Sequence, residues 1–181
     1  GTTAAAGVQK LRQALEQKGA VVVSSANPQG PASTGDVGWC ETGKLDELGH
    51  KLETGLVRQI EDELSNLAML IDSLLSVGWP RVRVVTDHGW LLMPEGLPKV
   101  DLPKSVTSAK WARCAAVKDG ASPDAATFPW YWDPHVRIAM PPGVGSYLAN
   151  AAYAHGGISP QECVIPELTV SRGAAPVSAT I

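Results

Sequence analysis

The sequence predicts an α/β protein whose open sheet is flanked by helices. Three observations favour this class. Helical and strand-like patterns alternate in the first half of the chain, and 18 glycines and 14 prolines among 181 residues mark many ordered connections. A polar Asp-His-Gly triplet also directly follows an apolar strand. Ligands of open α/β sheets gather at the carboxyl ends of strands, so the triplet marks where a site is expected.

The first elements are short. Apolar residues at helical spacing predict a helix over residues 6–18, which Gly19 ends. The run of apolar residues over 20–24 predicts a buried strand. Residues 27–38 show no period and hold several glycines and prolines, so they are expected to form a loop.

The strongest signal is a series of apolar residues that recur every three or four positions. It predicts one helix of about 25 residues, closed by Gly78. The β-branched segment 81–86 then predicts a strand, which carries Asp87, His88 and Gly89 at its carboxyl end. The apolar residues of the expected helix are Leu52, Leu56, Ile60, Leu64, Leu67, Ile71, Leu74 and Leu75.

The second half begins with a loop rich in proline and glycine over 94–103. Apolar and β-branched segments then predict strands over three ranges: 109–117, 136–140 and 146–150.

The last elements are a short helix and a strand. Ser159 and Glu162 match a capping box with Pro160 at the first helical position, so a helix should begin there. Residues 163–171 predict a final strand, and 172–181 are expected to be a flexible tail.

Composition excludes several classes of protein. Hydrophobic residues make up 44% of the chain and charged residues 18%, which is too apolar for a disordered segment. The net charge of −3 lacks the basic excess typical of polyanion-binding surfaces. Three distant cysteines without a CxxC pair favour reduced thiols in a cytoplasmic protein. No apolar run is long enough to span a membrane and no signal sequence opens the chain, so no membrane partner is expected.

Three short motifs carry candidate chemistry. Asp46 and His50 stand four residues apart, which puts a carboxylate and an imidazole on one helical face. Asp87 and His88 follow a strand, and His155 precedes two glycines. Each motif alone also fits an ordinary surface pair or turn. Their combination in this order favours a metal site.

That ordered series resembles the alkaline phosphatase superfamily, in its metal-binding part. The match to the superfamily lies in Asp-x-x-Gly-His at 46–50, the long helix, Thr-Asp-His-Gly at 86–89 and His-Gly-Gly at 155–157. Further segments, over about 38–171, resemble the PglZ family, the phosphatase-like component of bacterial BREX phage-defence systems. They include Thr-Asp-His-Gly-Trp-Leu-Leu at 86–92, Trp-Ala-Arg-Cys-Ala at 111–115, Pro-Trp-Tyr-Trp-Asp-Pro at 129–134 and Tyr-Ala-His-Gly-Gly-Ile-Ser at 153–159.

The resemblance implies a fold, cofactors and partners. Residues 1–171 would be the carboxyl-terminal lobe of an alkaline-phosphatase-like domain. Asp46, His50 and His155 would hold one divalent metal, and Asp87 and His88 part of a second. Two zinc ions are expected, with manganese or magnesium as alternatives. The substrate would be a phosphate ester, with nucleic acid as an open alternative, and the partners would be other defence proteins, including a methyltransferase component.

Two further expectations concern catalysis. The guanidinium of Arg113 suits bidentate phosphate contact and is the candidate catalytic residue, against an ordinary strand-face charge. The superfamily's nucleophile lies well before the first metal motif, and only 45 residues precede Asp46 here. Ser24 and Ser25 are weak substitutes. The chain is therefore expected to be part of a longer protein and to hydrolyse little by itself.

Two other functions remain open. One is a non-catalytic scaffold in a defence complex, which the missing nucleophile and the aromatic run Trp130, Tyr131 and Trp132 favour. Those aromatic rings could instead stack a nucleobase or plug a core. The other function is that of a relative of cofactor-independent phosphomutases, which the tryptophan-rich insertions after Met93 disfavour.

Overall fold

The computed structural model describes residues 2–173, with side chains from residue 7 onward. Helices and strands are mixed, so the α/β class is confirmed in general. The described chain divides into two compact units. Unit 1 comprises 2–44, 61–84 and 168–173, and unit 2 comprises 45–60 and 85–167.

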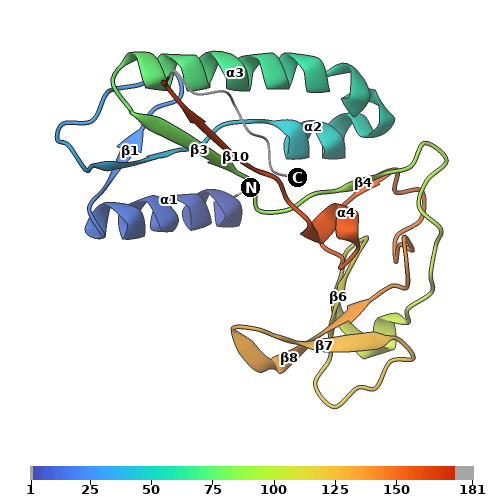
Figure 1. Cartoon of the computed structure of the whole chain (residues 1–181). Helices are drawn as coiled ribbons and strands as arrows, with labels where there is room; N and C mark the ends of the chain where they lie inside the picture. The colour runs from blue at the N-terminus through green and yellow to red at the C-terminus, as the bar shows by residue number, and fades with distance from the viewer. Residues whose placement is uncertain (1, 174–181) are drawn as a thin grey trace. The chain divides into compact units, whose positions relative to one another are not determined.

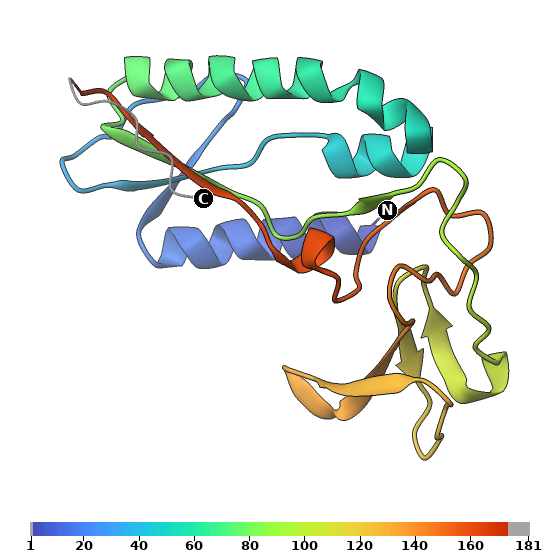
Figure 2. The same ribbon diagram turned by 45° about the vertical axis from the view of Figure 1, so that its right-hand side comes forward.

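Unit 1 places two helices around short strands. Figures 1 and 2 show α1 (Thr2–Gln17) and α3 (Ile60–Ser76) on opposite sides of these strands. β1 (Ala20–Val23) pairs in parallel with β2 (Val37–Cys40), and β3 (Arg81–Val85) pairs with β10 (Glu167–Ser171).

The core of unit 1 centres on a tryptophan. Val23, Leu74 and Trp79 form a buried cluster between α3 and the strands. The Trp79 Nε1 donates a hydrogen bond of 2.8 Å to the Gln29 carbonyl, so burial of the indole leaves no polar cost. A Cβ at Gly38 would lie 2.7 Å from the Trp79 ring, so only glycine lets β2 approach this closely.

Unit 2 holds a helical segment, two small sheets and a short helix. The helical segment is α2 (Leu45–Leu52) and the 3-10 helix η1 (Glu53–Arg58). β4 (Leu91–Leu92) and β9 (Tyr153–Ala154) form an antiparallel pair, and the 3-10 helix η2 (Lys104–Val106) and α4 (Pro160–Cys163) complete the unit. A four-stranded antiparallel sheet has the order β5-β6-β8-β7, with β5 (Thr107–Lys110), β6 (Ala115–Val117), β7 (Ala126–Trp130) and β8 (Asp133–Met140).

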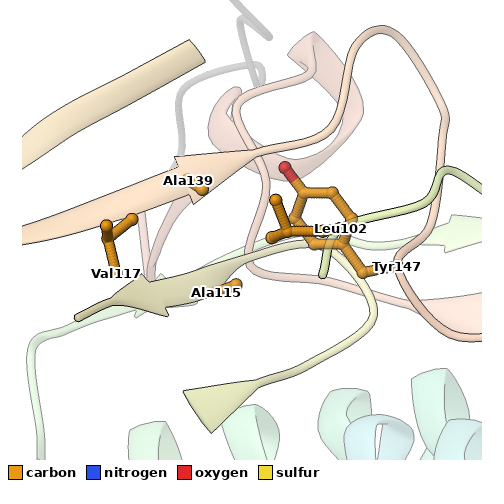
Figure 3. Close-up of a cluster of buried hydrophobic side chains, with 5 residues drawn as sticks. All are labelled: Leu102, Ala115, Val117, Ala139 and Tyr147. Atoms are coloured by element: carbon orange, nitrogen blue, oxygen red, sulfur yellow. The ribbon is translucent and has the colours of Figure 1, made fainter. Parts of the chain in front are cut away.

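The four-stranded sheet buries one face. Figure 3 shows the cluster, in which β6 and β8 contribute small and branched side chains and Leu102 and Tyr147 fill the space beside them. The members of this cluster are Leu102, Ala115, Val117, Ala139 and Tyr147.

Several predicted elements differ from the structure. The prediction of a single helix from Leu52 to Leu75 is wrong. Glu53 has a φ of +49°, so the chain leaves α2 and forms η1 before α3 begins. The strand over 109–117 is two strands, β5 and β6, closed by a hydrogen bond from Trp111 N to the Cys114 carbonyl. Residues 146–150 are not a strand: Ser146 makes only an isolated bridge, and Asn150 has a φ of +59°.

The predicted single open sheet is replaced by small ones. The strands of the described residues form four sheets, three of them two-stranded. The strand expected over 163–171 begins at Glu167, because α4 occupies residues up to Cys163 and Pro166 follows. The strands over 20–24 and 81–86 are confirmed, but β1 is not the buried strand expected, because among its four residues Val23 alone is buried. The capping box at Ser159 is also confirmed.

Of the expected tail over 172–181, residues 174–181 lie outside the described residues. The three cysteines are free thiols. Among the described residues, the helices are too short or too polar to cross a bilayer.

Candidate metal centre

Asp46 and His50 project from one face of α2. The helix starts with Asp46 and Glu47 in its first turn, where negative charge stabilises the helix dipole. Gly49, between the two candidate ligands, is buried against the Tyr153 ring, and a Cβ there would clash with that ring. The glycine therefore lets α2 lie directly on β9.

His155 completes a group of three donors, which we call the Asp–His–His cluster. His155 Nε2 lies 3.1 Å from Asp46 Oδ1 and 3.0 Å from His50 Nε2. His50 Nε2 lies 3.5 Å from Asp46 Oδ1. Asp46 and His50 are four residues apart on α2, whereas His155 stands 105 residues after His50.

These spacings fit a tetrahedral cation site. Ligand atoms at Zn–N distances of about 2.0–2.1 Å lie about 3.3 Å from one another along the edges of a tetrahedron. The three measured separations of 3.0, 3.1 and 3.5 Å bracket that edge. Three protein ligands leave a fourth position for water or substrate, as catalytic zinc sites require.

Tyr153 supports the cluster. Its hydroxyl donates a hydrogen bond of 3.1 Å to Asp46 Oδ1. Burial, followed by the negative charge of Asp46, raises the pKa of Tyr153, so the phenol remains a donor at neutral pH. Such outer-sphere donors orient metal-binding carboxylates. The sequence prediction missed Tyr153, although it stands two residues before His155, which follows β9 directly, and residues at i and i+2 of an extended segment point to the same side.

His155 is held neutral. Burial lowers the pKa of the His155 imidazole, and the neighbouring His88 lowers it further. A neutral imidazole keeps the lone pair that binds a cation. The lowered pKa therefore favours the neutral form of His155 at neutral pH.

Asp87 and His88 lie beside the cluster without joining its group of three. The His88 ring stacks on the His155 ring with centroids 4.1 Å apart. His88 Nδ1 lies 3.0 Å from the Gly89 carbonyl, and because a carbonyl oxygen only accepts, Nδ1 is the donor in this contact. Asp87 Oδ1 lies 3.8 Å from His88 Nε2, and its side chain is exposed. Asp87 and His88 therefore remain predicted ligands of a second site.

α4 connects the two segments that carry the histidines. Gly89 N donates to the Glu162 carbonyl over 2.9 Å, and a Cβ at Gly89 would clash with the Gln161 carbonyl. Glu162 Oε1 accepts a hydrogen bond of 2.8 Å from Gly157 N, two residues after His155. The capping box predicted at Ser159 thus ties both turns together.

Arg113 does not contact the site. Its side chain is 1% exposed, and it forms a bidentate ion pair with Glu162 at 3.0 and 2.9 Å. Nη2 of this pair also donates to the Gly143 carbonyl, and the remaining nitrogen, Nη1, donates to the Gly145 carbonyl. Burial alone raises the pKa of Glu162, but hydrogen bonds from Arg113, Ser159 and Gly157 lower it to about 2. The predicted phosphate contact is therefore wrong, because buried carboxylate and carbonyl oxygens already take these donors.

The aromatic run is exposed. Tyr131 is 86% and Trp132 76% exposed at the turn between β7 and β8, with ring centroids 4.3 Å apart. Tyr131 and Trp132 therefore do not fill a core, which excludes that alternative for these two residues.

Comparison with known protein families, with curated proteins and with solved structures finds no match to this chain.

Proposed function

We propose that this chain is the metal-binding lobe of a metal-dependent phosphoric ester hydrolase with an alkaline-phosphatase-like fold. The observation that carries the proposal is the Asp–His–His cluster, whose donor atoms lie within 4.8 Å of one another although His155 stands 105 residues from His50. The sequence resemblance adds the reaction class.

The residues have separate roles in this proposal. Asp46, His50 and His155 hold one divalent cation, and Tyr153 keeps the Asp46 carboxylate oriented. Asp87 and His88 contribute to a second cation. A bound divalent cation, zinc first and manganese or magnesium as alternatives, stabilises charge on the phosphoryl oxygens and lowers the pKa of a bound hydroxyl.

Zinc titration by calorimetry tests the cluster directly in this chain. His155→Gln should weaken zinc binding on the order of 100-fold or more, because a ligand is lost. The matched control is His135→Gln, since His135 is an exposed histidine on β8 outside the cluster. Equal affinity in wild type and His155→Gln would refute the cluster as a metal site.

Hydrolysis is tested in the natural protein that contains this sequence. Asp87→Ala should reduce phosphodiesterase turnover by about 10²-fold or more while the fold is retained. Asp133→Ala, which removes another exposed aspartate, should leave turnover unchanged. Full activity of Asp87→Ala would favour the scaffold function instead.

The scaffold function is favoured by the exposed Tyr131 and Trp132. In this alternative, the hairpin of β7 and β8 docks another protein of a phage-defence complex, such as its methyltransferase component. Tyr131→Ser with Trp132→Ser should then abolish co-purification with that component and phage protection, while zinc affinity is unchanged. Retained co-purification would exclude the hairpin as the interface.

A further inference from the structure

A cavity opens beside the Asp–His–His cluster. Its volume is about 510 Å³, which is within the range of pockets that take small organic molecules. His50, Tyr153 and His155 form part of its wall, so the cavity and the cluster share side chains. An ester with its phosphate at the cluster therefore has room for its organic group in this cavity.

The wall of the cavity is mainly apolar. Its apolar residues include Trp111 from the turn between β5 and β6, Leu148 and Ala151. Trp111 is 53% exposed and Leu148 is 42% exposed, so neither side chain is buried in the core and both can contact a ligand. Burial raises the pKa of Cys114, another wall residue, so its thiol is neutral at neutral pH.

The charges of the wall are also informative. Among the described residues that line the cavity there is neither lysine nor arginine, and Glu53 is its carboxylate. A second anionic group on the ligand would find no cation there and would be repelled by Glu53. The cavity thus differs from a groove that follows a polyanion, which requires basic side chains.

The backbone of the wall is strained at two positions. Glu53 and Asn150 are the non-glycine residues of the described chain with positive φ, at +49° and +59°, and both line the cavity. Such conformations cost free energy and concentrate at ligand sites, where the surrounding structure imposes them. The Asn150 amide also gives the wall a neutral hydrogen-bonding group.

We infer that this cavity binds the organic group of the ester and selects an uncharged, apolar group about the size of an aromatic ring over small or anionic groups. The inference rests on the proposed function, because the cluster must hold the phosphate. The residues that set the preference are Trp111 and Leu148, with Glu53 acting against anionic groups.

Phosphonates that cannot be hydrolysed test the inference. Zinc binding to this chain is measured first, and the zinc-loaded chain is then titrated with methylphosphonate, phenylphosphonate and 4-carboxyphenylphosphonate. Phenylphosphonate should bind at least about tenfold more tightly than methylphosphonate, because its ring leaves water. The carboxyphenyl compound should lose most of that advantage.

Three variants locate the preference. Trp111→Ala should reduce the phenyl advantage to about threefold or less, whereas Trp132→Ala, an exposed tryptophan outside the cavity, should keep it. Leu148→Arg is a surface change that should raise affinity for the carboxyphenyl compound above that of wild type. The affinity gain in Leu148→Arg tests the inference even if Trp111→Ala fails to fold.

The outcomes separate the two proposals. Absence of zinc binding overturns the proposed function and with it the inference. Zinc binding with equal affinity for methyl- and phenylphosphonate overturns the inference alone. A phenyl preference that Trp111→Ala and Leu148→Arg leave unchanged also overturns it, because the ring then binds elsewhere.

Discussion

At the scale of single residues, Tyr153 contacts one of the predicted metal ligands. Its hydroxyl donates a hydrogen bond to Asp46 Oδ1. Tyr153→Phe should lower zinc affinity about tenfold, because the carboxylate loses its orienting hydrogen bond. Calorimetric titration measures this, with Tyr131→Phe as an exposed control. Unchanged zinc affinity in Tyr153→Phe would mean that the hydroxyl does not orient the ligand.

Tyr147 presents the opposite case. Its ring fills the cluster in Figure 3, but its buried hydroxyl has no hydrogen-bond partner among the described residues. Tyr147→Phe should therefore leave the free energy of unfolding unchanged or raise it by about 1 kcal/mol, because a desolvated polar atom is removed. Urea denaturation measures the change. A loss of stability would show that the hydroxyl is satisfied in solution.

At the scale of elements, the contact of α2 with β9 depends on one glycine. Gly49→Ala improves helix propensity but drives a methyl group into the Tyr153 ring, and overpacking costs about 1–3 kcal/mol. The substitution should lower both the free energy of unfolding and zinc affinity. Gly7→Ala in α1 is the control, because a Cβ there meets nothing within 4 Å, and it should be neutral or stabilising. Equal effects of the two substitutions would contradict the packing argument.

The ion pair between Glu162 of α4 and Arg113 should make the stability of the molecule sensitive to acid. The folded-state pKa of Glu162 is about 2, below the ordinary value of 4.5, so the unfolded state binds the proton more readily. Its stabilisation is present above pH 4.5 and is lost as the pH falls toward 2. The loss should be on the order of 2–3 kcal/mol. Glu162→Gln should flatten this part of the pH dependence in urea denaturation, and a profile as steep as wild type would refute the assignment.

Elements with strong local signals were predictable from the sequence. The capping box at Ser159 and the strand before Asp87 each follow from neighbouring residues. The break at Glu53 did not follow, because the apolar period continues through it to the buried Leu56. β4 and β9 contain two residues each and exist only through their pairing with one another, so no local pattern reveals them.

At the scale of the whole molecule, the candidate site was more predictable than the sheet arrangement. The order of Asp46, His50 and His155 along the chain indicated their convergence, which the structure brings about. The role of Arg113 was not predictable, because its partner Glu162 stands 49 residues away and burial decides whether a guanidinium meets solvent. Pairing over such distances is a property of the fold rather than of a motif.

Metal binding should stabilise the molecule in a pH-dependent manner. A cation that binds only the folded chain raises the free energy of unfolding by about 2.7 kcal/mol when its free concentration is 100 times Kd. For a chain of this size, that corresponds to a rise of about 5–10 °C in melting temperature. His50 and His155 must be neutral to bind it, so protons compete with zinc as the pH falls. Burial lowers the pKa of His155, which keeps that imidazole ready at neutral pH.

Thermal melts with and without zinc at pH 8 and pH 5 test this linkage. At a fixed zinc concentration the upward shift at pH 8 should be at least twice that at pH 5, and excess EDTA should reverse it. His135→Gln should retain the shift and its pH dependence, whereas His155→Gln should lose both, because only the second histidine belongs to the cluster. Equal shifts at the two pH values, or a full shift in His155→Gln, would place zinc on other groups of the chain.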